Sequence, residues 1–202
     1  MQRLFLCSMF QNVWKLLKPL KPAMRGKTVT YIPTASKVEK LGWFVNIGKW
    51  KLKKLGMLVD ELDVSAQPYE TIQAALAKND YIYVTGGNTF FLLQELRRTG
   101  ADALLTDAIN NGKFYIGESA GAIVAAKDIG YSAAMDKKEK APHLKDYAGL
   151  GLIDFYVVPH SGNWEFGKAV EQIVADYANQ LNLSVISDKQ AIFVEGGNVK
   201  LL

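Results

Sequence analysis

The sequence of 202 residues lacks most of the features from which disulfides, metal sites and membrane helices are built. Its single cysteine, Cys7, excludes an intrachain disulfide and, because it lies in an apolar run, is predicted to be a core residue. The two histidines and the carboxylates show none of the spacings typical of a metal site. No apolar run approaches the roughly 20 residues of a membrane helix, and no small-residue cleavage site follows the apolar start. We therefore expect a globular, cytoplasmic protein.

Acidic residues are nearly absent from the beginning of the chain. Residues 1–54 contain 12 Lys and Arg but one acid, Glu39, so their net charge is +11, whereas the whole chain carries +4. Such a basic segment can bind nucleic acid or anionic lipid. Here the lysines are spaced among apolar residues such as Trp14 and Trp50, and no nucleic-acid motif is present. We predict a solvated face of amphipathic helices without a nucleic-acid or membrane partner. A non-catalytic protein that binds anionic partners through this segment is an alternative hypothesis.

Short apolar strands alternate with helical segments along the chain. We expect strands at 4–7, 27–32, 57–62, 81–84, 114–116, 155–158, 183–187, 191–195 and 199–202, and helices at 36–55, 68–78, 90–98, 101–111, 120–126 and 164–180. This alternation predicts one α/β domain over residues 1–202, with a three-layer, mostly parallel sheet and helices on both faces. Residues 196–198 (Gly-Gly-Asn) predict a hairpin that adds antiparallel strands at the C-terminal edge. The polar segment 128–147 is predicted to be a loop.

The most informative motif is G-x-S-x-G at residues 117–121, between a predicted strand and a predicted helix. The two glycines give the backbone room for a tight reversal. Such a turn would raise the hydroxyl of Ser119 above the sheet, near backbone N–H groups that can stabilise an oxyanion. The bare motif also arises by chance, but the strand before it and the helix after it are the context that it requires. The pattern therefore predicts Ser119 as a nucleophile.

A serine hydroxyl needs a base to remove its proton. Of the two histidines, His160 follows the predicted strand 155–158 and would lie at the same sheet edge as Ser119, whereas His143 lies in the polar segment. We predict His160 as the general base. The backbone N–H groups of Ala120, directly after the nucleophile, and of Gly87, after the strand 81–84, are the predicted oxyanion donors.

The carboxylate that would orient the histidine is left open by these patterns. Asp136, Asp128, Glu195 and Asp154 are all candidates for the acceptor of its second ring nitrogen. Glu118 directly precedes the predicted nucleophile, and its role is also open, since it would repel an anionic substrate if it faced the pocket. The Gly-Gly-Asn sequence at 86–88 lacks the lysine and the spacing of a phosphate-binding loop.

Three motifs in this order carry a resemblance to a known family: Thr-Gly-Gly-Asn-Thr at 85–89, Gly-Glu-Ser-Ala-Gly-Ala at 117–122 and Pro-His at 159–160. The sequence resembles the peptidase E family of serine peptidases, family S51, relatives of cyanophycinase. The resemblance spans nearly the whole chain. It implies a fold similar to class I glutamine amidotransferases, with serine replacing cysteine, and cytoplasmic peptide hydrolysis without a cofactor.

By position, the resemblance implies Ser119 as nucleophile, His160 as general base, and Gly87 with Ala120 as oxyanion donors. The family's acidic member falls after the elbow helix, where Asp136 is the nearest match, and a glutamate near the C-terminus would point instead to Glu195. We take Asp136 as the third catalytic residue.

One segment departs from the family pattern. Family members that cleave after an N-terminal aspartate carry arginines after the histidine, whereas residues 161–167 here contain one acid, Glu165, and no arginine. This difference argues against aspartyl-dipeptide specificity. We predict a serine-type peptidase that hydrolyses small peptides through an acyl-enzyme on Ser119, with an esterase or amidase on non-peptide substrates as the alternative. The sequence leaves open whether the chain is a monomer or a homodimer.

Overall fold

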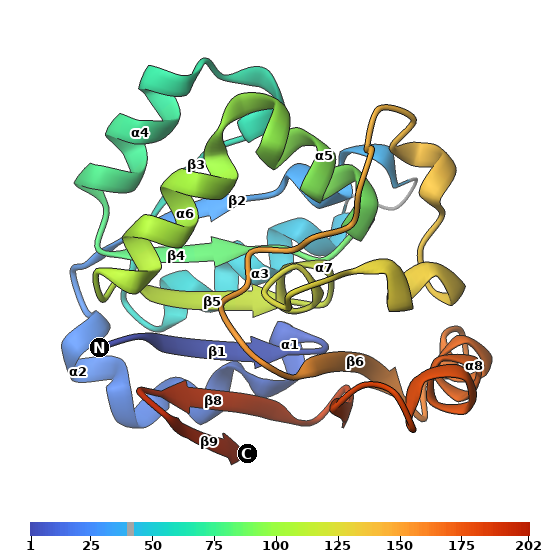
Figure 1. Ribbon diagram of the computed structural model, residues 1–202. Helices are drawn as coiled ribbons and strands as arrows, with labels where there is room; N and C mark the ends of the chain where they lie inside the picture. The colour runs from blue at the N-terminus through green and yellow to red at the C-terminus, as the bar shows by residue number, and fades with distance from the viewer. Residues whose placement is uncertain (40–42) are drawn as a thin grey trace.

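The computed structural model of the chain describes residues 1–39 and 43–202, and the side chains of all these residues except 43–45 (Figure 1). Part of the predicted helix 36–55 therefore lies outside the described residues. Within them, no helix has the length and apolar character needed to cross a membrane.

A seven-stranded sheet runs through the middle of the molecule, in the order β3-β2-β4-β5-β1-β8-β9 (Figure 1). The strands from β3 to β1 are parallel to one another, β8 is antiparallel to β1, and β9 is antiparallel to β8. The strands are β1 (Arg3–Cys7), β2 (Thr28–Ile32), β3 (Leu58–Glu61), β4 (Tyr81–Val84), β5 (Phe114–Glu118), β8 (Ala191–Glu195) and β9 (Asn198–Leu201). The predicted fold class, a mostly parallel α/β sheet with an antiparallel pair at its C-terminal edge, is confirmed.

Helices cover both faces of this sheet, because successive side chains of each strand point to opposite faces. In β1, Leu4 and Leu6 pack into one hydrophobic cluster, whereas Phe5 and Cys7 pack into another, where Cys7 is fully buried as predicted. The first cluster includes α4 (Tyr69–Lys78), α5 (Thr89–Thr99), α6 (Ala101–Asn110) and α8 (Gly167–Tyr177). The second includes α1 (Phe10–Val13), the 3-10 helix η1 (Trp14–Leu20), α2 (Lys21–Met24) and α3 (Trp43–Lys54).

A second, two-stranded sheet lies beside the main one. Strands β6 (Tyr156–Ser161) and β7 (Leu183–Ser187) pair with each other in parallel, with an irregular register between Val158 and Ser161. The expectation that 155–158 belongs to the main sheet is wrong, because the edge of β1 that faces away from β5 is occupied by β8. Strand β6 packs instead against α8 and against the short helix α7 (Ala120–Ile123).

Helices near the predicted site are shorter than the sequence indicates. The chain after β2 forms the 3-10 helix η2 (Thr34–Val38) and is extended again at Glu39, which is followed by the undescribed residues 40–42. Helix α7 ends at Ile123 because the next carbonyl oxygens accept hydrogen bonds from a distant segment: Leu150 N–H donates to Val124 and Leu152 N–H to Ala125, both at 2.8 Å. Helix α8 begins at Gly167, three residues later than expected.

The predicted loop 128–147 contains two single-turn 3-10 helices, η4 (Gly130–Ala134) and η5 (Lys138–Lys140). Its ends are held together by a β-bridge between Asp128 and Ala148. This arrangement returns the chain to the sheet edge at which β4 and β5 end (Figure 1).

Candidate active site

Ser119 occupies a sharp reversal between β5 and α7. Its backbone has φ 49° and ψ −106°, a combination that L-residues rarely adopt, and its N–H donates to the carbonyl of Cys7 at 2.8 Å. Strain of this kind is typical of functional sites. The flanking glycines are required by space, because a Cβ atom at Gly117 would lie 2.5 Å from the carbonyl oxygen of Gly121, and one at Gly121 would lie 2.4 Å from that of Val84. The motif therefore forms the predicted elbow.

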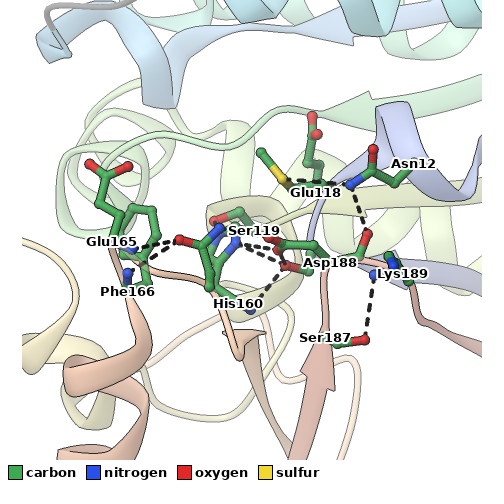
Figure 2. Close-up of polar contacts among 12 residues, drawn as sticks. Asn12, Glu118, Ser119, His160, Glu165, Phe166, Ser187, Asp188 and Lys189 are labelled. Atoms are coloured by element: carbon green, nitrogen blue, oxygen red, sulfur yellow. Dashed lines mark hydrogen bonds and ion pairs between the residues drawn. The ribbon is translucent and has the colours of Figure 1, made fainter.

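His160 lies directly beside this serine (Figure 2). The Nε2 atom of His160 is 2.9 Å from Oγ of Ser119, although the two residues are 41 positions apart. His160 is 6% exposed, has φ 69° within the irregular part of β6, and stacks its ring on Phe166 with the centroids 4.6 Å apart. The imidazole is thus held in one place, with the nitrogen that faces Ser119 ready to accept its proton.

The carboxylate that contacts His160 is Asp188, in the turn between β7 and β8. Its Oδ1 atom lies 2.8 Å from Nδ1 of His160, and its Oδ2 atom accepts a hydrogen bond from Asn163 at 2.7 Å. Partial burial alone would raise the pKa of Asp188, but hydrogen bonds from His160, Ser8 and Asn163 outweigh it and lower the pKa to about 2. Asp188 is therefore ionised at neutral pH and can stabilise a positive charge on the imidazole.

Ser8, directly after β1, completes the surroundings of the imidazole. Its hydroxyl donates to Oδ1 of Asp188 at 2.5 Å, lies 2.9 Å from Nδ1 of His160, and accepts the backbone N–H of His160 at 2.9 Å. Ser8 is almost fully buried, at 1% exposure. One hydroxyl thus fixes both the backbone of His160, with its positive φ, and the carboxylate that contacts its ring.

Asp136 does not contact His160. Its Oδ2 atom accepts the backbone N–H of Thr89 at 3.0 Å and the Thr89 hydroxyl at 2.5 Å, and burial raises its pKa. The structure therefore lacks the expected contact between Asp136 and the imidazole, because this carboxylate accepts hydrogen bonds from Thr89 at the start of α5.

The other three candidate carboxylates also lie elsewhere. Asp128 accepts the N–H of Gly130, and Asp154 is exposed. Glu195 is an exposed residue at the end of β8, opposite Arg3 in the register of β8 with β1. Asp188 alone among the described carboxylates makes a hydrogen bond to the ring of His160.

Two backbone N–H groups next to Ser119 are free to stabilise an oxyanion. The N–H groups of Thr85 and Asn88 donate to the carbonyls of Ile32 and Ala35, at 3.1 and 2.9 Å, whereas that of Gly87 has no acceptor among the described residues. The N–H of Ala120 likewise has none, although those of Ser119 and Ala122 do. Ala120 is buried and Gly87 is half-buried. Buried N–H groups are normally paired, so unpaired ones beside Ser119 suit the expected role of Ala120 and Gly87.

The loop that carries Gly87 is tightly packed against its surroundings. Gly87 has φ 138°, and a Cβ atom there would lie 2.2 Å from the carbonyl oxygen of Ala35. A Cβ atom at Gly86 would lie 3.1 Å from Cβ and 3.7 Å from Oγ of Ser119. The backbone of this loop therefore lies against Ser119, the predicted nucleophile. Within the described residues, no cluster of three or more His, Cys, Asp or Glu could hold a metal ion.

Comparison with known proteins identifies the family of this chain. The model of peptidase family S51 matches residues 6–202. The chain belongs to peptidase family S51. This S51 peptidase is 50% identical to an uncharacterized peptidase of Listeria innocua over 98% of this chain and 95% of the relative. It is 31% identical to peptidase E of Salmonella arizonae over 68% of this chain and 56% of the relative.

Solved structures agree with this assignment. A Listeria monocytogenes EGD-e protein, described as a candidate peptidase E, superposes with a TM-score of 0.96 at 46% identity, covering 100% of this chain and 98% of the other. A peptidase from an acI-B1 actinobacterium superposes with a TM-score of 0.74 at 19% identity, covering 100% and 87%, and shares the fold. The predicted membership of the peptidase E family is confirmed.

Sequence reasoning missed two members of the site in this S51 peptidase, Asp188 and Ser8. Each directly follows a strand, Asp188 after β7 and Ser8 after β1, so both lie where strands deliver polar residues to an edge. The available signal was the predicted strand 183–187 with its Ser-Asp end. Using it would have required the knowledge that this strand pairs with the one that carries His160.

Proposed function

We propose that this S51 peptidase is a serine peptidase that cleaves small peptides through an acyl-enzyme on Ser119. The observation that carries the proposal is the continuous chain of contacts from Ser119 Oγ to His160 Nε2, at 2.9 Å, and from His160 Nδ1 to Asp188, at 2.8 Å. Nucleophile, base and orienting carboxylate in this relation form the arrangement of a serine hydrolase, whichever fold carries it.

The reaction follows from these positions. Oγ of Ser119 attacks the carbonyl carbon of the scissile peptide bond while His160 Nε2 takes the hydroxyl proton. The negative charge that develops on the carbonyl oxygen is stabilised by the N–H groups of Gly87 and Ala120. The imidazolium, stabilised by Asp188, then gives its proton to the leaving amine as the C–N bond breaks. Water, deprotonated by the same imidazole, hydrolyses the ester on Ser119 and releases the acid.

The substrate class rests on family membership and on the relatives named peptidase E. Residues 161–167 supply no arginine, and the side chain of Phe166 covers the ring of His160. We therefore propose short peptides without a requirement for an N-terminal aspartate.

A fluorophosphonate probe followed by mass spectrometry tests the nucleophile. We expect one phosphonylated residue, Ser119, and no labelling of Ser119→Ala, which should also lower kcat at least about 10³-fold while the protein stays folded. Labelling at another residue, or none in folded protein, would contradict the proposal. A panel of dipeptides and simple esters then separates a peptidase from an esterase, since hydrolysis of esters alone would favour the latter.

A further inference from the structure

The carboxylate of Glu118 accepts hydrogen bonds from two different segments. Its Oε2 atom accepts the hydroxyl of Tyr83 at 2.6 Å, and its Oε1 atom accepts the backbone N–H of Phe10 at 2.8 Å. The backbone N–H of Gly86 lies close enough to the same carboxylate to lower its pKa. The side chain is mostly enclosed, and burial raises its pKa, while these three groups oppose this effect.

Glu118 points away from the chemistry that it adjoins. Figure 2 shows its carboxylate turned away from the row formed by Ser119, His160 and Asp188. A negative charge facing that row would oppose the developing oxyanion. Here the carboxylate accepts hydrogen bonds from Tyr83 and Phe10, on the side of the elbow away from the row (Figure 2). The short contact with Tyr83 has the length typical of a hydroxyl that donates to an ionised carboxylate.

Each of these three groups belongs to a segment that carries part of the site. Phe10 lies two residues after Ser8, which holds His160 and Asp188. Gly86 directly precedes Gly87 and packs against Ser119. Tyr83 belongs to β4, the strand that leads into this glycine loop. Glu118 itself is bonded through the backbone to Ser119.

We propose that Glu118 is a positioning residue that fixes the Gly86–Gly87 loop and the segment after β1 relative to the nucleophile. This inference rests on the proposed function and deepens it. The Tyr83 hydroxyl held by Glu118 and the Asn88 N–H held by the carbonyl of Ala35 fix the chain on both sides of Gly87. The Gly87 N–H is thereby presented to the oxyanion without reorganisation, which is what makes such donors effective.

The test compares Glu118→Gln with wild type and with the matched control Glu171→Gln, an exposed residue of α8. Glutamine keeps the shape but has a single acceptor oxygen, so it cannot replace both carboxylate oxygens as acceptors for Tyr83 and Phe10. We expect kcat to fall by roughly 10-fold to 100-fold with KM changed less than about threefold, because a slightly misplaced oxyanion donor acts on the transition state. A peptide aldehyde, whose adduct carries the oxyanion, should lose affinity by a similar factor. Glu171→Gln should change neither quantity.

Equal kcat and aldehyde affinity in Glu118→Gln and wild type would overturn the inference. If KM rises while kcat is unchanged, Glu118 acts on substrate binding, and the inference is also wrong. Amide hydrogen exchange of Phe10, whose N–H donates to Glu118, gives a readout that does not depend on activity, and we expect faster exchange in Glu118→Gln. Failure of the proposed function is distinguishable, because wild-type protein would then show no fluorophosphonate adduct on Ser119.

Discussion

Replacing Asp188 by asparagine tests the pairing that the structure makes and the sequence did not predict. An amide can turn its NH₂ group toward Nδ1 of His160, which places the proton of the neutral ring on Nε2. That nitrogen then faces Ser119 as a donor and no longer accepts its proton. In a serine protease with this arrangement, the corresponding change lowers kcat by about 10⁴.

The structure argues for a smaller loss here. The hydroxyl of Ser8 also lies 2.9 Å from Nδ1 and accepts the backbone N–H of His160, so ring position and part of the tautomer preference survive the substitution. We therefore expect kcat to fall by roughly 10²-fold to 10³-fold in Asp188→Asn. This loss lies between no effect, if the ring kept its proton on Nδ1, and the full loss of about 10⁴, if the proton moved entirely to Nε2.

The assay is kcat for the best substrate of the dipeptide panel, together with the rate of fluorophosphonate labelling. Asp107→Asn, at an exposed position of α6, is the control and should match wild type. Asp136→Asn serves as the comparison, because its carboxylate contacts Thr89 instead of His160. A loss below about fivefold in Asp188→Asn, with a larger loss in Asp136→Asn, would refute the reasoning and return Asp136 to the third position.

Three further predictions follow from charge and packing. The pKa of Asp188 is about 2 in the folded protein against an ordinary 3.8, so its ionised carboxylate stabilises the protein above pH 3.8, and this contribution is lost as the pH falls toward 2. The full shift corresponds to about 2.5 kcal/mol of unfolding free energy, of which partial exposure leaves about half. The measurement is the pH dependence of urea unfolding, compared between wild type and Asp188→Asn. Gly87→Ala should lower kcat at least about 10²-fold and should also lower the melting temperature, because the added Cβ would meet the backbone of Ala35. The control is Gly26→Ala, which also has a positive φ of 77° but open space around it, and it should leave kcat unchanged. The basic segment 1–54 should not bind RNA or anionic vesicles at physiological salt in gel-shift and sedimentation assays, because Lys18, Lys51 and Lys54 lie over the indole rings of Trp14 and Trp50. Strong salt-sensitive binding would contradict this prediction.

The sequence predicted the parts of the molecule that are encoded locally. The elbow at Ser119 could be found because its glycines are demanded by contacts within a few residues and with the neighbouring strand. The strands could be found because each is a short apolar run, and the hairpin at 196–198 because Gly-Gly-Asn specifies its turn.

The parts that could not be predicted depend on which strands lie side by side. Nothing local indicates that β8 occupies the outer edge of β1, so that β6 and β7 pair separately. That pairing is what brings Asp188 to His160. Asp136 was favoured by its position after the elbow helix, but its carboxylate is taken by Thr89, a contact 47 residues apart that no periodicity indicates.

The hydroxyl of Ser8 joins segments that are 180 positions apart, because it contacts both Asp188 and the imidazole of His160. The imidazole therefore acquires these partners only after synthesis has passed Asp188 and β7 has paired with β6. A copy that ends before Asp188 would keep Ser119 and His160 but would lack the carboxylate that contacts Nδ1 of the ring.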